Sequence, residues 1–275
     1  MRICLLTPDP HHPLLAATTA LLTPHHEVTW LDPTGLEDFP DPSDLSDVYL
    51  LKTRTPRALA LARHLEEHGA PVLNSAAATE LCQDRTAMAD VARRDGLPFV
   101  ATRTEPSLAP LVAAGEPAAP VVVKSRHSRR HDLVARVDDA AGLRELAARW
   151  PDEPVVVQPF TPNDGWDHKL WVVADQVFAA LRRSELADAV PGSRTRALAP
   201  GELPAGWAEL AWRVGEVFAL DVYGVDLLDA GGTPVIVDIN AFPGIRGQHG
   251  APEALAALAL RTATGSRRPR VPAVP

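Results

Sequence analysis

Short apolar runs and amphipathic stretches alternate along the first quarter of the chain. Apolar runs at 2–7, 27–31, 48–53 and 71–74 predict β-strands. The intervening segments 13–22 and 56–68 are typical of helices, the second with Leu59, Ala62 and Leu65 at helical spacing. Strands that alternate with helices indicate a parallel sheet covered by helices. We therefore expect residues 1–75 to form a small parallel α/β domain.

The rest of the chain favours paired strands with fewer helices. Predicted strands lie at 120–125, 132–137, 154–160, 222–228 and 235–240, with a further pair joined at Ala174-Asp175; predicted helices lie at 79–95, 139–150, 206–220 and 252–261. The fold class is therefore α/β (α+β), with two mixed or antiparallel α+β domains after the first. We place a central domain with its linker helix at 76–160, a C-terminal domain at 161–262 and a disordered tail at 263–275.

Three oxygen-bearing side chains converge in the predicted hairpin at 222–240. A Gly-Gly turn between β-branched runs predicts antiparallel pairing. Asp238 and Asn240 share a face because side chains alternate along a strand. A turn with an odd number of residues places Asp226 opposite Ile236, so Asp226 joins the same face. Such hard oxygen ligands suit Mg²⁺, and the alternative is that these polar side chains face solvent.

Composition limits the classes of function. The 275 residues are 46% hydrophobic, enough to bury a core, and the net charge is −8. This acidity argues against general binding of nucleic acid or anionic membranes. Cys4 and Cys82 are too few for a disulfide framework. Without an apolar leader or a run long enough to cross a bilayer, we expect a cytoplasmic protein.

The hairpin residues also carry a family resemblance. The spacing of Asp226, Asp238 and Asn240, together with the segment VDINAFPG, resembles the metal-binding part of ATP-grasp enzymes. Two branches are most similar, the RimK-type amino-acid ligases and the inositol trisphosphate kinases, and the likeness runs from about Asn74 to Gly247. It implies an ATP-grasp fold in which two domains clamp ATP. It further implies one or two Mg²⁺ ions, or Mn²⁺, held by these three side chains.

The resemblance also implies which residues bind the nucleotide. They are Arg85, Lys124, His131, Gln158, Phe160 and Lys169. Arg85 belongs to an Asp-Arg pair inside a predicted helix, as in the inositol kinases, whereas the ligases carry Asp-Lys. Taken alone, that pair would be an ion pair on a helix surface, and Lys124 would be a snorkelling lysine. Pro159 replaces the glutamate common in the adenine hinge and removes an N–H donor.

The predicted loop at 126–131 departs from the family. Ligases of this type have a glycine-rich loop there, which covers phosphates with backbone N–H groups. This loop, RHSRRH, has no glycine, and five of its six residues can be cationic. Phosphate would then be held by arginine side chains, and His131 resembles a histidine of the kinases. The alternative is a mobile basic loop.

Catalysis in such enzymes depends on charge neutralisation, and we nominate no side-chain nucleophile. The candidate catalytic cations are Lys169, Arg183 and Arg246. Asp167 lies two residues from Lys169 on one strand face, so the two could instead pair with each other. Between Arg182 and Arg183 we favour Arg183. Candidate substrate contacts are Lys52, Arg54, Arg130, Arg194 and Gly244. Lys52 and Arg54 follow a predicted parallel strand, where ligands bind, and would otherwise be surface charges.

Three functions compete. The first is an ATP-dependent carboxylate–amine ligase acting through an acyl phosphate. The second is a kinase of the inositol phosphate type, favoured by Arg85 and the glycine-free loop. The third is a nucleotide-binding module without catalysis, which the intact metal triad disfavours. We expect the ligase, because the kinase-like motifs touch parts of the site that both branches share. Its substrate would be a small molecule or short peptide, with neither nucleic acid nor membrane as partner, and the chain could form a homodimer.

Overall fold

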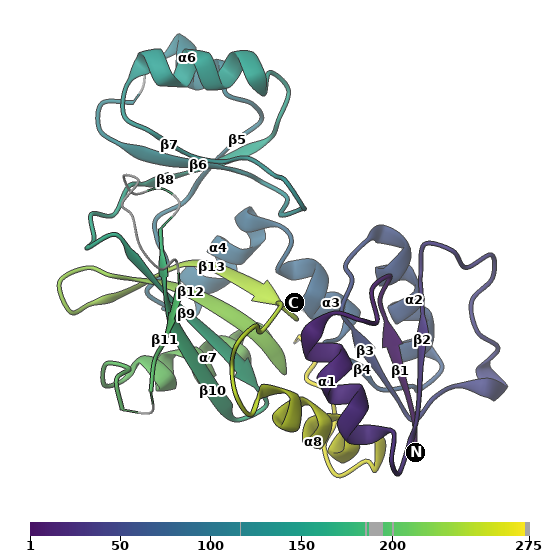
Figure 1. Cartoon of the computed structure of the whole chain (residues 1–275). Coiled ribbons are helices and arrows are strands. Elements are labelled where there is room, and N and C mark those ends of the chain that lie inside the picture. The colour runs from purple at the N-terminus through teal and green to yellow at the C-terminus, as the bar shows by residue number, and fades with distance from the viewer. Residues whose placement is uncertain (116, 185, 187–194, 200, 273–275) are drawn as a thin grey trace.

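The computed structural model describes residues 1–115, 117–184, 186, 195–199 and 201–272. Within these residues the chain forms three β-sheets (Figure 1). A parallel sheet is built from the N-terminal residues, and two antiparallel sheets follow. The α/β (α+β) fold class predicted from the pattern of strands and helices is confirmed.

The N-terminal sheet is parallel, with the strand order β2-β1-β3-β4. Its strands are β1 (Arg2–Leu6), β2 (Glu27–Leu31), β3 (Val48–Leu51) and β4 (Val72–Leu73), and its helices are α1 (Pro13–Leu22) and α2 (Pro56–Glu67), with a 3₁₀ turn, η1, at Pro42–Asp44. Every side chain of β3 is buried. Val48 and Leu50 pack toward α1, whereas Tyr49 and Leu51 pack toward α2, as expected for a strand covered on both faces.

The predicted helix at 79–95 is in fact two helices. α3 (Ala76–Leu81) ends before Asp84, and α4 (Arg85–Arg94) begins directly after it. The Asp84 carboxylate accepts hydrogen bonds from the backbone N–H groups of Thr86 and Ala87, at 2.9 and 3.4 Å. This N-cap satisfies donors that a helix start leaves free, so the chain can break and restart there. Sequence periodicity alone does not reveal the break.

The second sheet belongs to a separate lobe at the top of Figure 1, which we call the lid. Its strands are β5 (Arg103–Glu105), β6 (Val121–Ser125), β7 (Val134–Val137) and β8 (Val155–Pro159), in the order β5-β8-β6-β7. The helices α5 (Ala109–Ala113) and α6 (Ala140–Arg149) share one apolar core with this sheet. β5 and α5 were not predicted, because each is a single short run without a clear apolar period.

The third sheet carries the hairpin with the candidate metal ligands. Its strands are β9 (Trp166–Val173), β10 (Gln176–Arg183), β11 (Thr195–Ala197), β12 (Val222–Asp229) and β13 (Pro234–Ala241), in the order β11-β10-β9-β12-β13. α7 (Trp207–Val217) packs on one face together with Met88 and Ala92 of α4. The linker helix α4 is therefore part of the core of this sheet, and it contributes no residue to the core of the lid.

The register of the hairpin differs from the prediction. Asp226 pairs directly with Asp238, and Leu227 pairs with Ile236, because a β-bulge shifts the register between Asp226 and Leu227. Paired residues point to the same side of a sheet, so the two carboxylates still share a face. Asn240 pairs with Gly224, two residues along, and is on that face as well.

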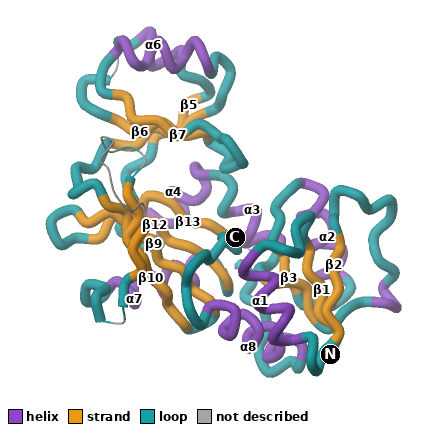
Figure 2. The backbone as a smooth tube through the Cα atoms, in the orientation of Figure 1, coloured by secondary structure: helices purple, strands orange, loops and turns teal. Residues whose placement is uncertain are grey.

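The C-terminal segment returns to the first domain. α8 (Ala251–Ala263) lies beside α1 (Figure 1 and Figure 2) and shares a core with β1 and β3. Part of the tail that was predicted to be disordered makes specific contacts. Arg267 Nη2 donates to Asp221 Oδ1 at 2.8 Å, and Arg270 donates its backbone N–H to Asp221 Oδ2 at 2.9 Å. Asp221 is fully buried, so it needs these partners.

The helices of the described residues give no candidate for a membrane span, since none combines sufficient length with sufficient apolar character.

Candidate active site

A cleft lies between the lid and the third sheet. Its empty volume, which includes the mouth open to solvent, is about 880 Å³. Apolar side chains lining it include Val122, Val134, Phe160, Leu228 and Val237, and charged ones are Lys124, Asp167, Lys169, Arg182, Asp226 and Asp238. An apolar wall beside a set of alternating charges suits a ligand with a flat base and a polyphosphate.

Asp226 on β12 forms an ion pair with Lys169, its cross-strand neighbour on β9. Lys169 Nζ is 2.6 Å from Asp226 Oδ2 and 4.0 Å from Asp167 Oδ2. Burial disfavours the charge on Lys169, but Asp226 and Asp167 outweigh it and raise its pKa. The predicted pairing of Lys169 with Asp167 is therefore the longer of two contacts, and the lysine remains a cation directed into the cleft.

Asp238 is surrounded by cations. Burial would raise its pKa, yet Arg85, Lys124 and Lys169 together hold that pKa below its usual value. Arg85 Nη2 is 3.3 Å from Asp238 Oδ2, and the backbone N–H of Ile239 donates to Oδ1 at 3.1 Å. Asp238 is thus an ionised, inward-facing carboxylate, the state that a metal ligand requires.

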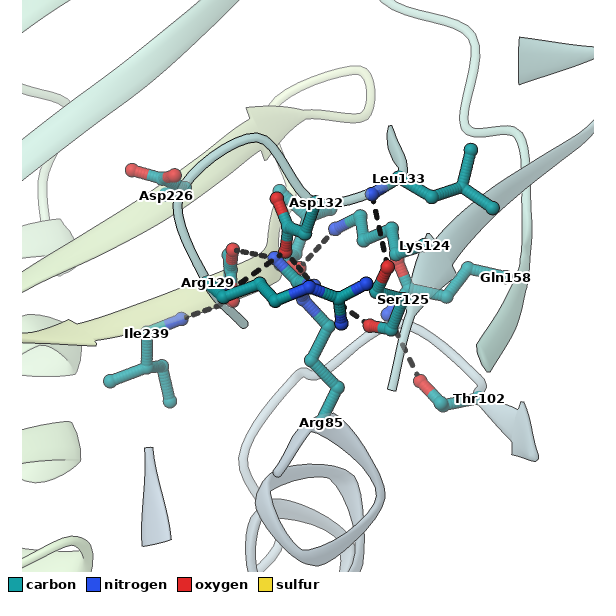
Figure 3. A network of polar contacts seen from close by, with 12 residues as sticks. Arg85, Thr102, Lys124, Ser125, Arg129, Asp132, Leu133, Gln158, Asp226 and Ile239 are labelled. Carbon is teal, nitrogen blue, oxygen red and sulfur yellow. Dashed lines mark hydrogen bonds and ion pairs between the residues drawn. The ribbon is translucent and has the colours of Figure 1, made fainter. Parts of the chain in front are cut away.

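Arg85 joins three parts of the molecule (Figure 3). From the start of α4, its Nη1 donates to the carbonyl of Ser125 at 2.8 Å and to Asp132 Oδ2 at 2.7 Å in the lid, and its Nη2 reaches Asp238 on β13. The side chain is 5% exposed, and its Nε has no partner among the described residues. A buried donor of this kind beside the cleft is suited to an anionic group of a ligand.

Lys124 and Gln158 reach the cleft from the lid sheet. Lys124 Nζ donates to the carbonyl of Val237 at 2.7 Å, and burial lowers its pKa although Asp238 and Asp226 act in the opposite direction. Gln158 Nε2 donates to Thr102 Oγ1 at 3.1 Å. Both side chains are buried, which disfavours the snorkelling alternative for Lys124.

The predicted adenine hinge follows β8. Phe160 lines the cleft, and its backbone N–H donates to the carbonyl of Pro120 at 3.0 Å. Its ring lies under the guanidinium of Arg136, whose Cζ is 4.1 Å from the ring centroid. Pro159, which has no N–H, also lines the cleft. The hinge therefore lacks an N–H at Pro159, and Phe160 adds apolar surface to the cleft.

Ion pairs connect the glycine-free loop at 126–131 to neighbouring elements. Arg126 donates Nε and Nη2 to the two oxygens of Asp84, at 3.1 and 2.7 Å, and Arg129 Nη2 is 2.7 Å from Glu153. Arg130 and His131 are exposed and are not among the residues that line the cleft. The structure thus brings Arg85, Lys124, Gln158, Phe160 and Lys169 together, but it leaves Arg130 and His131 outside.

Arg183 faces away from the cleft, contrary to the sequence prediction. Its guanidinium stacks on Trp166, with Cζ 5.2 Å from the ring centroid. Arg182 pairs with Asp167 and lines the cleft beside Lys169. The reason is strand alternation, because Asp167 and Lys169 point into the cleft and their cross-strand partners share that face. The basic residue at this position is therefore Arg182.

The remaining substrate candidates gather elsewhere. Lys52, just after β3, donates from Nζ to the carbonyl of Phe242 at 3.1 Å. Gly244 and Arg246 lie in the same loop after β13, and Arg54 acts electrostatically on Lys52. None of these residues lines the cleft. Arg194 falls outside the described residues.

Sequence reasoning missed several residues that the fold brings to these sites. They are His12, Thr102, Asp132 and Ser184, whereas Arg182 was weighed against Arg183 but not chosen. Arg182 follows from alternation once the face of Lys169 is known. Asp132 directly follows the basic loop at 126–131. An acidic residue next to several cations could have been predicted to form an ion pair with one of them. His12 and Thr102 carry no local signal, because distant segments determine their neighbours.

The residues fit a divalent cation held together with a nucleotide. Among the described residues, no cluster of three or more His, Cys, Asp or Glu forms a metal site of its own. Two facing aspartates and Asn240 provide too few ligands for a closed site, which matches the preference of Mg²⁺ for one or two carboxylates plus substrate phosphates. Lys169 and Arg85 form ion pairs with the two carboxylates.

Comparison with known proteins agrees with this geometry. The RimK-like ATP-grasp domain family matches residues 102–254, more than half of the chain. The chain belongs to the RimK-like ATP-grasp family. The expected resemblance to ATP-grasp enzymes is thereby confirmed, and the RimK-like branch is the one whose family matches.

Individual relatives support the same family. The chain is 29% identical over 203 residues to the probable alpha-L-glutamate ligase 2 of Shewanella sp. (strain W3-18-1), a match over 70% of this chain. The match spans 66% of that relative's length, just under two thirds.

Solved structures show the shared fold. A RimK domain ATP-grasp protein from Sphaerobacter thermophilus DSM 20745 has a TM-score of 0.75 at 24% identity, covering 94% of this chain and 99% of the other. The D-alanine–D-alanine ligase of Bacillus anthracis has a TM-score of 0.71 at 15% identity, covering 97% and 100%. All three sheets are therefore part of an ATP-grasp fold.

Proposed function

We propose that this RimK-like ATP-grasp protein is an ATP-dependent carboxylate–amine ligase. The observation that carries the proposal is the in-register pair of Asp226 and Asp238, which faces a cleft lined by Lys124 and Lys169. Such a site supports phosphoryl transfer from ATP. The choice of ligase over kinase, made from sequence, is supported by the relatives, whose names describe an alpha-L-glutamate ligase and a D-alanine–D-alanine ligase.

The reaction has two steps. A substrate carboxylate oxygen attacks the γ-phosphorus of ATP, the bond to the bridging oxygen breaks, and ADP leaves with an acyl phosphate formed. An amine then attacks the carbonyl carbon, phosphate leaves with the C–O bond electrons, and the nitrogen loses a proton. The result is an amide, ADP and inorganic phosphate. Both steps concentrate negative charge on phosphate oxygens, so the protein accelerates them by positioning and by opposing charge.

The side chains divide this task. The apolar wall around Phe160 holds the base, and Lys124, Lys169 and Arg182 neutralise the phosphate oxygens. Bound Mg²⁺, or Mn²⁺ in its place, would neutralise the phosphates further, with Asp226, Asp238 and Asn240 as its protein ligands. Release of Arg85 from Asp238 would leave its guanidinium close to the phosphates, and its Nε has no partner in the part of the chain that the structure describes.

The acceptor that we propose is a small molecule or a short peptide, in a cytoplasmic setting where ATP is available. A homodimer is compatible with this activity. A kinase would use the same ATP site, so the test must follow the fate of the phosphoryl group.

Hydroxylamine provides that test. An acyl phosphate reacts with it to give a hydroxamate, so a ligase incubated with Mg-ATP, hydroxylamine and a pool of carboxylates including L-glutamate should form hydroxamate and release ADP and phosphate. A new phosphate ester in the ³¹P NMR spectrum, without hydroxamate, would show a kinase instead.

The matched variants for this test lie on one hairpin. Asp238→Asn removes a charge from the candidate metal site, and we expect ADP release to fall by more than about 100-fold, beyond the loss typical of a residue that only supports a ligand. Asp229→Asn removes a charge at the turn end of the same hairpin and should retain activity. Equal activity of the two variants would contradict the metal assignment.

A further inference from the structure

Gln158 is a neutral polar side chain within the apolar wall of the ATP cleft. It pairs across β6 and β8 with Val122, and it lines the cleft together with Val100, Val122 and Phe160. The residue is only 3% exposed. A neutral amide at this place adds no charge that could oppose a phosphate. What it offers to a ligand is therefore hydrogen bonding, and the direction of that bonding depends on which end of the amide faces the cleft.

The hydroxyl of Thr102 determines the orientation of this amide. Thr102 Oγ1 donates its proton to the backbone carbonyl of Val100 at 3.0 Å. Because a hydroxyl has a single proton and a carbonyl can only accept, Oγ1 is left as an acceptor toward its other neighbour. That neighbour is Gln158 Nε2, at 3.1 Å (Figure 3). A rotation of the amide by 180° would place Oε1 against an oxygen that has no proton to give.

The amide oxygen of Gln158 is the end that this arrangement leaves over. Within the part of the chain that the structure describes, Oε1 takes part in no hydrogen bond. A buried acceptor without a partner costs free energy, and an N–H group of a ligand removes that cost. Since the side chain lines the cleft, a bound molecule can reach it. The amide thus favours a ligand that presents a donor at this point.

Purine bases differ in the group that they present at C6. Adenine carries an amino group, which donates, whereas guanine and hypoxanthine carry a carbonyl oxygen, which accepts. Two acceptors that face each other repel and leave both oxygens without a proton. A buried site that is arranged to bind an N–H group therefore rejects an analogue that lacks it more strongly than an apolar surface does.

We propose that Thr102 positions the amide of Gln158 so that Oε1 accepts a hydrogen bond from the 6-amino group of the nucleotide base. In this role Gln158 contacts the base, and Thr102 is a positioning residue that acts through it. The consequence is selection of 6-amino purines over 6-oxo purines. The inference rests on the proposed function for the presence of a nucleotide in the cleft, but not for the reaction that the nucleotide undergoes.

Calorimetry on the full-length protein tests the proposal with two nucleotides, Mg-ADP and Mg-inosine diphosphate. Inosine diphosphate replaces the 6-amino group with a 6-oxo group and carries a proton on N1. The wild type should bind ADP about tenfold or more tightly than inosine diphosphate, the effect of one mismatched hydrogen bond. Thr102→Val should reduce this ratio to less than about threefold, because the amide is then free to rotate. Thr102→Ser keeps the hydroxyl and should keep the ratio.

A matched control lies two residues away on β5. Thr104 Oγ1 is 2.7 Å from Thr86 Oγ1, and Thr104 is exposed and does not line the cleft. Thr104→Val makes the same chemical change and should leave the ratio of the two affinities unchanged. The ratio is the informative quantity, because a general disturbance of the lid weakens the binding of both nucleotides alike.

A double variant shows whether Thr102 acts through the amide. Gln158→Leu should lower the ratio, and Thr102→Val in the Gln158→Leu background should lower it no further. Equal affinity of the wild type for the two nucleotides would overturn the proposal. So would a wild-type ratio in Thr102→Val, or an additional loss in the double variant. Circular dichroism shows whether each variant folds, and Thr102→Ala, which also lacks the hydroxyl, replaces Thr102→Val if that variant does not.

The hydroxamate assay separates this inference from the proposed function. Hydroxamate formation together with a ratio of affinities that ignores Thr102 would leave the ligase without this means of base selection. The reverse result, a ratio that depends on Thr102 in a protein that forms no hydroxamate, would leave the base selection in a protein of another activity.

Discussion

Two neighbouring arginines at the end of β10 have opposite surroundings. Arg182 lines the cleft, whereas Arg183 stacks on Trp166 on the other face of the same sheet. At the scale of single residues, strand alternation determines to which face of the sheet a side chain points. The charge of Arg182 and Arg183 is the same, so charge alone does not distinguish them.

This difference makes a paired prediction. Arg182→Met should raise the KM for ATP by about tenfold or more, because it removes a charged contact to the phosphates. Arg183→Met should change the KM by less than about twofold, since its partner is an aromatic ring outside the cleft. Steady-state ADP release at varied ATP concentration measures both. A larger effect from Arg183→Met would reverse the assignment of faces.

At the scale of elements, the loop between β6 and β7 takes a form that its basic sequence alone does not indicate. The Asp84-Arg85 pair at the start of α4 holds both ends of this loop, with Asp84 binding Arg126 and Arg85 binding Asp132. We interpret the ion pairs as the element that orders this loop before ATP binds.

Limited proteolysis tests this interpretation. Trypsin cleaves after arginine, and the loop contains Arg126, Arg129 and Arg130. Asp132→Asn should accelerate cleavage in the loop by about tenfold or more, because it removes a charged hydrogen bond to Arg85 and raises the open population. Asp138→Asn, at an exposed position just after β7, is the control and should cleave at the wild-type rate. Equal rates for both variants would show that the ion pair does not order the loop.

At the scale of the whole molecule, the C-terminal segment joins the first and third sheets. α8 packs against α1, and the segment after it supplies two partners to the buried Asp221 at the start of β12. Asn74, from the end of β4, accepts hydrogen bonds from the N–H groups of Asp221 and Val222, at 2.8 and 2.9 Å. The strand that carries Asp226 is thus anchored from both ends of the chain.

Arg267→Ala should lower the free energy of unfolding by about 3 kcal/mol, because it leaves a buried carboxylate without its cation. Urea denaturation measures this change. Arg268→Ala, at an exposed neighbouring position, should stay within about 0.5 kcal/mol of the wild type. Asp221→Asn in the Arg267→Ala background should recover part of the loss, and a failure to do so would mean that packing rather than charge is responsible.

The sequence by itself determined most of the longer elements and the chemical inventory of the site. Hydrophobic periodicity is a local property, so the strands, the helices and the hairpin with its three oxygen ligands could be predicted from neighbours along the chain. The ATP-grasp resemblance followed from the spacing of Asp226, Asp238 and Asn240, because ligands on one hairpin keep their distance in sequence.

Only the tertiary structure decided which charges meet. The β-bulge after Asp226, the break before α4 and the inward face of Arg182 depend on backbone geometry that residue types do not encode one by one. The hydrogen bond from Lys52 Nζ to the carbonyl of Phe242 likewise joins residues that are far apart in the chain. Electrostatic interactions act through space, so their partners become known only when the sheets are packed together.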